Sequence, residues 1–71
     1  MYFLKLTSMI YYVDFSFSPF GSVFRETITA STLIRAYNEF KRIHKGQKIF
    51  VHRILSKYYD EYLLLNSKTI I

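Results

Sequence analysis

The residues from Gly46 to Leu65 contain two strand-forming segments on either side of a short basic one, and this arrangement predicts a fold rich in β-structure. Residues 48–53 (KIFVHR) and 58–65 (YYDEYLLL) are rich in the β-branched and aromatic residues that favour strands. Between them, residues 53–57 (RILSK) place two cations and a hydroxyl where the chain is expected to turn. Such a turn can bond phosphate oxygens, or it can be an ordinary solvated turn.

Residues 9–17 (MIYYVDFSF) form the clearest predicted strand, because successive side chains of a strand point to opposite faces. The residues on one face, which we assign to the core, are Met9, Tyr11, Val13, Phe15 and Phe17. The residues on the other face are Ile10, Tyr12, Asp14 and Ser16.

Two more strands and a turn are expected in the first half of the chain. Residues 18–22 (SPFGS) contain the Pro and Gly of a turn, and residues 23–29 (VFRETIT) have strand propensity. The short apolar segment at residues 2–6 could be an edge strand.

The middle of the chain allows two interpretations. In the one we favour, residues 31–37 (STLIRAY) form a strand and residues 38–47 a loop, because residues 29–32 (TAST) make a poor helix start within a β-rich chain. In the other, a helix runs over residues 31–44 and Gly46 ends it. The apolar residues that would share one side of that helix are Leu33, Ile34, Tyr37 and Phe40.

Five short strands with turn signals predict an all-β fold, a small closed or nearly closed barrel that forms a single domain over residues 1–71. A core of this size supplies only about 3–5 kcal/mol. Because the chain has no cysteine, disulfides cannot add to that stability. We therefore expect a binding partner to stabilise the domain.

The net charge of +5 comes entirely from the second half of the chain. Residues 1–33 contain two cations and two acids, whereas residues 34–71 contain eight cations and three acids. Together with seven Tyr and seven Phe, this basic half suits nucleic acid, because cations bind phosphates and rings stack on bases. An anionic membrane surface would also accept it.

The composition argues against catalysis and metal binding. With no cysteine, two histidines and five scattered acids, the chain has little from which to build a zinc site or a carboxylate pair. No nucleophile–base pair is visible, and no uncharged run approaches the roughly 20 apolar residues of a membrane helix. We expect a protein that is not an enzyme, with no cofactor, metal, small-molecule substrate or membrane span.

The composition also bears on where the protein is made. Phe, Tyr, Ile and Lys are abundant while Gly and Pro are scarce and Trp is absent, as AT-rich coding would produce. The first residues show neither a basic segment before an apolar block nor an Arg-rich amphipathic presequence. We expect the protein to be made inside an organelle, and we favour the mitochondrion over other organelles.

Three segments of the second half share the order and character of motifs in one protein family. Residues 34–39 (IRAYNE) resemble a Tyr-Lys-Ala-His-Asp-Glu segment, and Gly46 follows seven residues later at a Gly-Asp position. Residues 53–57 resemble an Arg-Pro-Leu-Ser-Lys signature, and residues 62–65 take the place of a closing Trp-x-Val strand. The family is protein seventeen of the small ribosomal subunit. The resemblance covers residues 31–66 well and residues 9–30 weakly.

The chain departs from the family pattern at several positions. Tyr37 stands for His, Asn38 for the first acid of the Asp-Glu pair, and Ile54 for Pro. Ser18 stands for the His of a His-Pro loop, and the strand before Arg53 is about two residues short.

The resemblance implies a five-stranded OB-fold barrel with a shortened N-terminal strand, which binds the 5′ region of small-subunit rRNA and supports subunit assembly beside neighbouring ribosomal proteins. Folded RNA is recognised largely through its shape, 2′-hydroxyls and phosphates, by groups on loops of a rigid scaffold. The residues expected first at such contacts are Arg53, Ser56 and Lys57. A second basic group comprises Arg35, Lys41, Arg42, Lys45 and Lys48, and Tyr37 and Asn38 are expected to reach RNA from the loop.

Two other functions remain open. A general single-strand nucleic-acid-binding OB module would need aromatic residues exposed beside cations on one sheet face. The residues that could serve are the aromatic Tyr12, Tyr58 and Tyr62 and the aliphatic Ile10, provided that they face solvent. An accessory structural subunit of an organellar membrane complex would instead bury residues 2–24 against other polypeptides.

Overall fold

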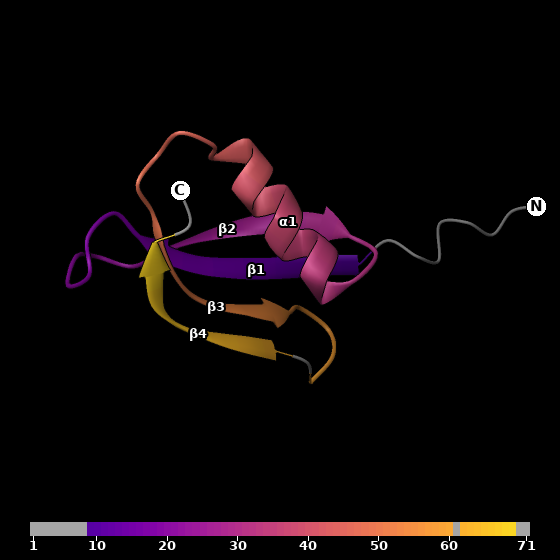
Figure 1. Ribbon diagram of the computed structural model, residues 1–71. Helices are drawn as coiled ribbons and strands as arrows, with labels where there is room; N and C mark the ends of the chain where they lie inside the picture. Colours follow the sequence, from indigo (N-terminus) through magenta and orange to yellow (C-terminus); the bar gives the residue numbers. More distant parts are fainter. Residues whose placement is uncertain (1–8, 61, 70–71) are drawn as a thin grey trace, which may run out of the picture.

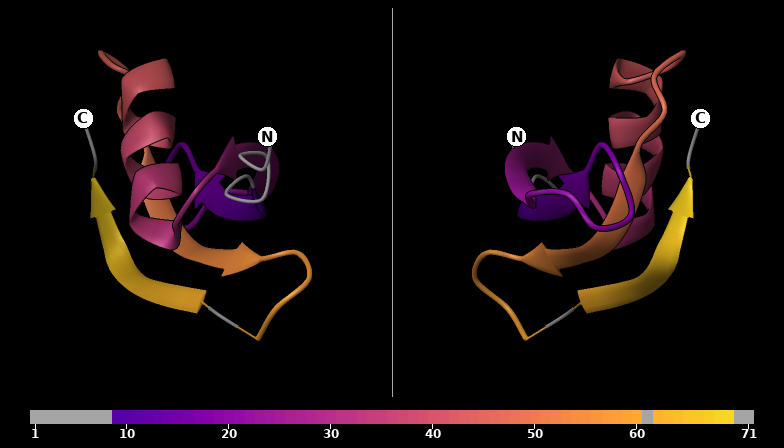
Figure 2. Two further views of the ribbon diagram at one scale, coloured as in Figure 1. Left: turned by 90° about the vertical axis from the view of Figure 1, so that its right-hand side faces the viewer. Right: turned by 90° about the vertical axis from the view of Figure 1, so that its left-hand side faces the viewer.

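The computed structural model describes residues 9–60 and 62–69, which form an antiparallel sheet of four strands with one helix across one face (Figure 1). The elements are β1 (Met9–Ser16), β2 (Phe24–Ala30), α1 (Leu33–Ile43), β3 (Phe50–Ser56) and β4 (Tyr62–Thr69). The strand order β2-β1-β3-β4 places β1 between β2 and β3. The sheet is strongly curved, and β3 and β4 bend up toward α1 (Figure 2).

β1 and β2 form a hairpin around the predicted Pro- and Gly-containing turn. The backbone N–H of Gly21 donates to the carbonyl of Ser18 (3.2 Å). The two strands pair in regular register up to Phe15, which lies opposite Phe24. The predictions of both strands and of the turn are confirmed, with strand boundaries shifted by one residue.

The core lies between α1 and the face of the sheet that carries the odd-numbered residues of β1. The buried hydrophobic residues are Tyr11, Val13, Phe15, Ile28, Leu33, Ala36, Phe40, Ile49, Val51 and Ile54. The core face predicted for β1 is therefore confirmed at Tyr11, Val13 and Phe15. Phe17 is half exposed instead of buried, because β1 ends at Ser16.

α1 occupies most of the segment for which a strand and a loop were predicted. The strand predicted at residues 31–37 is wrong, and the loop predicted at residues 38–47 is right only for residues 44–47. The side chain of Thr32 accepts a hydrogen bond from the backbone N–H of Arg35 (3.1 Å), the usual N-cap contact of a threonine. Residues 29–32 are thus the end of β2 and the start signal of the helix.

The alternative interpretation, a helix ending before Gly46, is confirmed for residues 33–43, but Ile34 is exposed and does not share the buried side. Leu33, Ala36 and Phe40 are buried against the sheet, and packing of this apolar side outweighs the strand propensity of the segment. Gly46 has φ = 90°, in the left-handed region that glycine adopts without strain after a helix.

The turn predicted at residues 53–57 is wrong except at Lys57. Residues 53–56 are the second half of β3, because this strand continues to pair with β1 as far as Ser56. The bend covers residues 57–60 instead. The strand predicted at residues 58–65 consequently begins later, at Tyr62.

A β-bulge in β3 explains why its sequence lacks simple alternation. One step along β1, from Phe15 to Asp14, corresponds to two steps along β3, from Val51 to Arg53. His52 is the extra residue. As a result, Val51 and Ile54 are both buried in the core although they are three residues apart, and Arg53 is exposed.

The fold is mostly β, as predicted, but the described residues do not form a five-stranded closed barrel. Because residues 33–43 are helical, the described residues contain four strands, and β2 and β4 lie at opposite edges of an open sheet. The strand predicted at residues 2–6, which the resemblance would make the shortened N-terminal strand, lies outside the described residues. In the part of the chain that the structure describes, no helix has the length and apolar character needed to cross a membrane.

Candidate nucleic-acid interface

The face of the sheet opposite α1 carries one carboxylate between two arginines. Asp14 lies on β1, directly across from Arg25 on β2 and from Arg53 on β3. Arg25 donates from Nε to Oδ1 of Asp14 (2.8 Å) and from Nη2 to Oδ2 (3.1 Å). Arg53 donates from Nε to the same Oδ2 (2.7 Å). The Asp14 side chain is only 8% exposed, whereas those of the arginines are 45% and 49% exposed, so a buried acid holds two surface cations in place.

The net charge of Asp14, Arg25 and Arg53 depends on whether the Asp14 carboxyl is ionised. The hydrogen bonds from Arg25 hold the pKa of Asp14 below its ordinary value of 3.8, against burial, which raises it, and Arg53 lowers it further. The carboxylate in turn raises the pKa of Arg25. At neutral pH the group therefore contains two positive charges and one negative charge.

Tyr12 lies two residues before Asp14 on the same face, and cations lie beside it. The guanidinium of Arg25 is 4.7 Å from the centroid of the Tyr12 ring. Lys57 lies near the same tyrosine, and its Nζ is 5.2 Å from the ring centroid of Tyr58. A hydrogen bond to Tyr58, and the neighbouring Tyr12, raise the pKa of Lys57 above its ordinary value. Lys57 is therefore firmly held as an ammonium at neutral pH.

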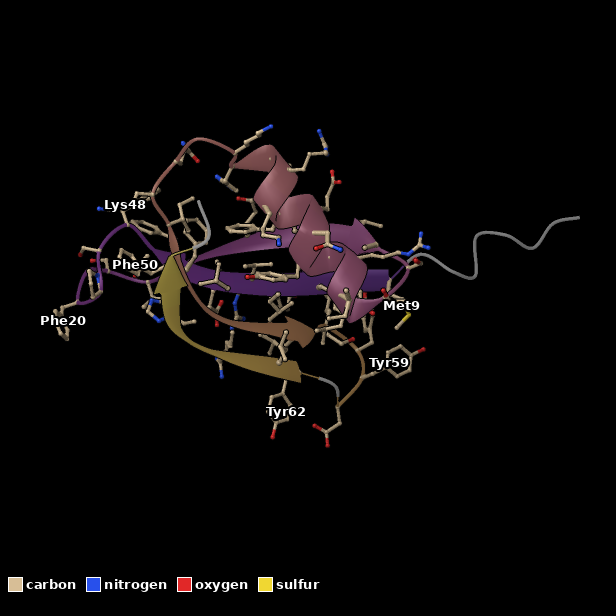
Figure 3. All side chains as sticks on the ribbon, in the orientation of Figure 1. Met9, Phe20, Lys48, Phe50, Tyr59 and Tyr62 are labelled. Carbon is tan, nitrogen blue, oxygen red and sulfur yellow. The ribbon has the colours of Figure 1, made fainter. Side chains whose placement is uncertain are left out.

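Exposed tyrosines lie at the connection between β3 and β4. Tyr58 is in the bend and is 67% exposed, and Tyr62 begins β4 and is 62% exposed. Tyr62 pairs with Leu55, which pairs with Tyr12, so Tyr62 belongs to the face opposite α1. Figure 3 shows Tyr62 pointing away from α1. We refer to Tyr12, Asp14, Arg25, Arg53, Lys57, Tyr58 and Tyr62 as the arginine–tyrosine face.

The three residues predicted first for RNA contact differ in exposure. Arg53 and Lys57 are exposed and belong to the arginine–tyrosine face. Ser56 is buried, and its Oγ accepts a hydrogen bond from the backbone N–H of Tyr59 (3.2 Å). Ser56 therefore stabilises the bend and does not face a ligand.

The other predicted contacts lie on the far side of the sheet. Arg35, Tyr37, Asn38, Lys41 and Arg42 are on α1, and Lys45 and Lys48 follow it. Two of these cations have partners on the helix, since Lys41 lies 4.8 Å from the ring centroid of Tyr37 and Arg42 pairs with Glu39. The structure does not bring this group together with Arg53 and Lys57; Lys48 lies far from Tyr62 in Figure 3.

The sequence prediction omitted Asp14 and Arg25. Net charge does not reveal Arg25, because it lies in the half of the chain whose charges balance. A usable signal is symmetry: Asp14 and Arg25 are equally distant from the turn at Pro19 and Phe20, and residues so placed face each other in a hairpin.

Both histidines have partners within the fold. His52 Nε2 and Ser16 Oγ are 2.7 Å apart. The ring nitrogens of His44 lie 2.6 Å from Oε1 of Gln47 and 2.8 Å from Oε1 of Glu26, which ties the end of α1 to β2. Over the described ranges, no three His, Cys, Asp or Glu residues come together in a way that could hold a metal ion.

Comparisons of this chain with protein families, with curated proteins and with solved structures found no match.

Proposed function

We propose that this protein binds RNA through the arginine–tyrosine face, as a structural component of the small ribosomal subunit. The observation that supports RNA binding best is Tyr12, with Arg25 over its ring and Lys57 nearby, on a sheet face that α1 leaves uncovered. Cations bind phosphates and aromatic rings stack on unpaired bases, so this combination suits RNA. The role is binding and assembly, with no catalytic step.

The ribosomal part of the proposal rests on the sequence. Residues 34–39 and 53–57 resemble motifs of protein seventeen of the small ribosomal subunit, and the second half of the chain is basic. The ligand would then be the 5′ region of small-subunit rRNA, beside neighbouring ribosomal proteins, and the composition favours the mitochondrial ribosome. Because the described fold differs from the barrel of that family, the motifs alone support the ribosomal assignment.

The cations of α1 and of the loop after it supply a second contact surface in this proposal. Arg35, Lys45 and Lys48 are exposed there, on the side of the sheet opposite Arg53 and Lys57. Two basic surfaces on opposite sides suit a folded RNA that encloses a small protein.

Sedimentation of an organelle lysate through a sucrose gradient tests the ribosomal assignment. We expect the protein to travel with the small subunit at low salt and to leave it as salt is raised, because its phosphate contacts weaken with salt. A protein that stays at the top of the gradient, or travels with membrane complexes, would overturn the assignment.

Salt-dependent binding to an rRNA fragment tests which surface holds RNA. Changing Arg53 and Lys57 together to alanine should flatten the plot of log affinity against log salt by up to about two ion equivalents. The matched double change at Lys45 and Lys48 measures the second surface. An unchanged slope in the first variant would exclude Arg53 and Lys57 as phosphate contacts.

A second candidate function is favoured by the end of the β1–β2 hairpin. Phe20 is fully exposed there, and Phe17, Val23 and Phe24 are each about half exposed. An apolar patch of this kind suits contact with another polypeptide, as in an accessory structural subunit of an organellar membrane complex. The same gradient separates the candidates, because this one predicts travel with a membrane complex and release when Phe20 is changed to serine.

A further inference from the structure

We infer that the RNA bound by the arginine–tyrosine face is single-stranded, with one phosphate between Arg25 and Arg53 and a neighbouring base stacked on Tyr62. This inference rests on the proposed function and adds the class of RNA and the contacts that select it. It involves Asp14 and Arg25, which the sequence did not single out.

The proposed phosphate contact uses guanidinium N–H groups that do not take part in the hydrogen bonds to Asp14. Arg25 uses Nε and Nη2 toward the carboxylate, and Arg53 uses Nε. The Nη1 group of Arg25 and both Nη groups of Arg53 take no part in these contacts, and both side chains are about half exposed. Guanidinium groups match phosphate oxygens in planar, paired hydrogen bonds. Two such groups held on one carboxylate can therefore converge on a single phosphate.

The shared carboxylate also prepares this site before RNA arrives. Asp14 is buried on the central strand, and its hydrogen bonds fix the orientation of both arginines. A long side chain that is already ordered loses less conformational entropy on binding. The positive charges exceed the negative charge by one, so the site still attracts an anion.

The tyrosines are the reason to expect that the bound RNA is single-stranded. Tyr12 is two residues, or about 7 Å, along β1 from Asp14, and Tyr62 lies on the same face two strands across. An extended RNA strand that leaves the arginine pair would pass Tyr12, meet the ammonium of Lys57 and bring a base to the exposed ring of Tyr62. A duplex keeps its bases stacked inside, so it offers phosphates to the arginines but no base to the tyrosine.

Fluorescence anisotropy with two labelled probes tests the inference: a short oligouridylate, and a blunt-ended RNA duplex of the same length. We expect the single strand to bind more tightly. Tyr62→Leu should weaken single-strand binding about tenfold and leave duplex binding unchanged. Arg25→Lys and Arg53→Lys should each weaken it several-fold, because lysine keeps the charge but loses the paired donors. Tyr59→Leu, the same change at an equally exposed tyrosine outside the arginine–tyrosine face, is the matched control for Tyr62→Leu and should have no effect.

The outcomes separate this inference from the proposed function. Equal binding of both probes with no effect of Tyr62→Leu would overturn the single-strand inference while RNA binding stands. Single-strand binding that neither Arg25→Lys nor Arg53→Lys weakens would overturn the phosphate site. Absence of binding to either probe and to an rRNA fragment would overturn the proposed function itself.

NMR of the arginine Nε–H groups in the unaltered protein tests the phosphate site even if a variant fails to fold. We expect the Nε–H signals of Arg25 and Arg53 to shift when oligouridylate is added. Signals that do not shift would exclude the phosphate site.

Discussion

Asp14 on β1 and Arg53 on β3 are 39 residues apart in the sequence, and Oδ2 of the first lies 2.7 Å from Nε of the second. The bulge at His52 makes this contact, because it turns Arg53 toward Asp14 while Val51 and Ile54 remain in the core. One carboxylate thus links the packing of the central strands to the surface that we propose for RNA.

Asp14→Asn should destabilise the protein by about 1–3 kcal/mol, because charge-assisted hydrogen bonds from two arginines are lost at a buried position. Urea unfolding followed by circular dichroism measures the change. Asp60→Asn, at an exposed residue of the bend, is the matched control and should stay within about 0.5 kcal/mol of the unaltered protein. Equal effects of the two substitutions would contradict the role of Asp14.

Stability should fall at acidic pH through Asp14. Its pKa is lower in the folded protein than the ordinary value of 3.8, chiefly because Arg25 donates to it, so the unfolded chain binds the proton more readily. The stabilisation is complete well above pH 3.8 and is lost as pH falls through the pKa of the folded state.

Thermal unfolding at a series of pH values checks this expectation. The gap in melting temperature between the unaltered protein and Asp14→Asn should narrow as pH is lowered from neutral to below 3.8. Glu39→Gln is a useful comparison: Arg42 also lowers the pKa of Glu39, but this pair lies at the surface, where water screens it. If the difference in melting temperature between the unaltered protein and Asp14→Asn is the same at every pH, Asp14 is not the titrating group.

The start of α1 gives a test of the helix that replaced the predicted strand. Thr32→Ala removes the side chain that accepts from the N–H of Arg35 and should cost about 1 kcal/mol. Thr32→Ser keeps the acceptor and should restore most of the stability. If serine and alanine behave alike in urea unfolding, the N-cap contact does not form in solution.

A conservative core change tests the packing of β3 under α1. Ile54 is completely buried, so Ile54→Val should cost about 0.5–1.5 kcal/mol by removing one methyl group from the core. Ile34 is exposed on α1, and the same change there should stay within about 0.5 kcal/mol. Calorimetry or urea unfolding of the pair compares the two sites directly, and a larger effect at Ile34 would show that this face of the helix is covered in solution.

The sequence predicts well where local preference and packing agree. The alternation in residues 9–17 identifies both β1 and the core face at Tyr11, Val13 and Phe15. Residues 29–32 are different, because Thr and Ser suit a strand and a helix cap equally. The buried side of α1, with Ala36 and Phe40 against the sheet, decides between them, and that packing is not a local property of the sequence.

The candidate site was predictable only in part, for a related reason. Arg53 and Lys57 stand out as cations in a basic segment, and both are exposed. The orientation of Arg53 depends on the bulge, and its partner Asp14 depends on the register of β1 with two other strands. Neither register can be read from charge or hydropathy alone, since each is set by packing across the whole sheet.

The position of β1 in the middle of the sheet determines the order in which its two edges are paired during synthesis. The hairpin of residues 9–30 can pair as soon as it leaves the ribosome that makes it, but the second edge of β1 stays open until β3 has been translated. An open edge beside apolar side chains invites aggregation in that interval. Because Arg53 arrives with β3, the same step that closes this edge also completes the arginine pair. A nascent chain would therefore complete the arginine pair that we propose for phosphate only when its central strand is protected.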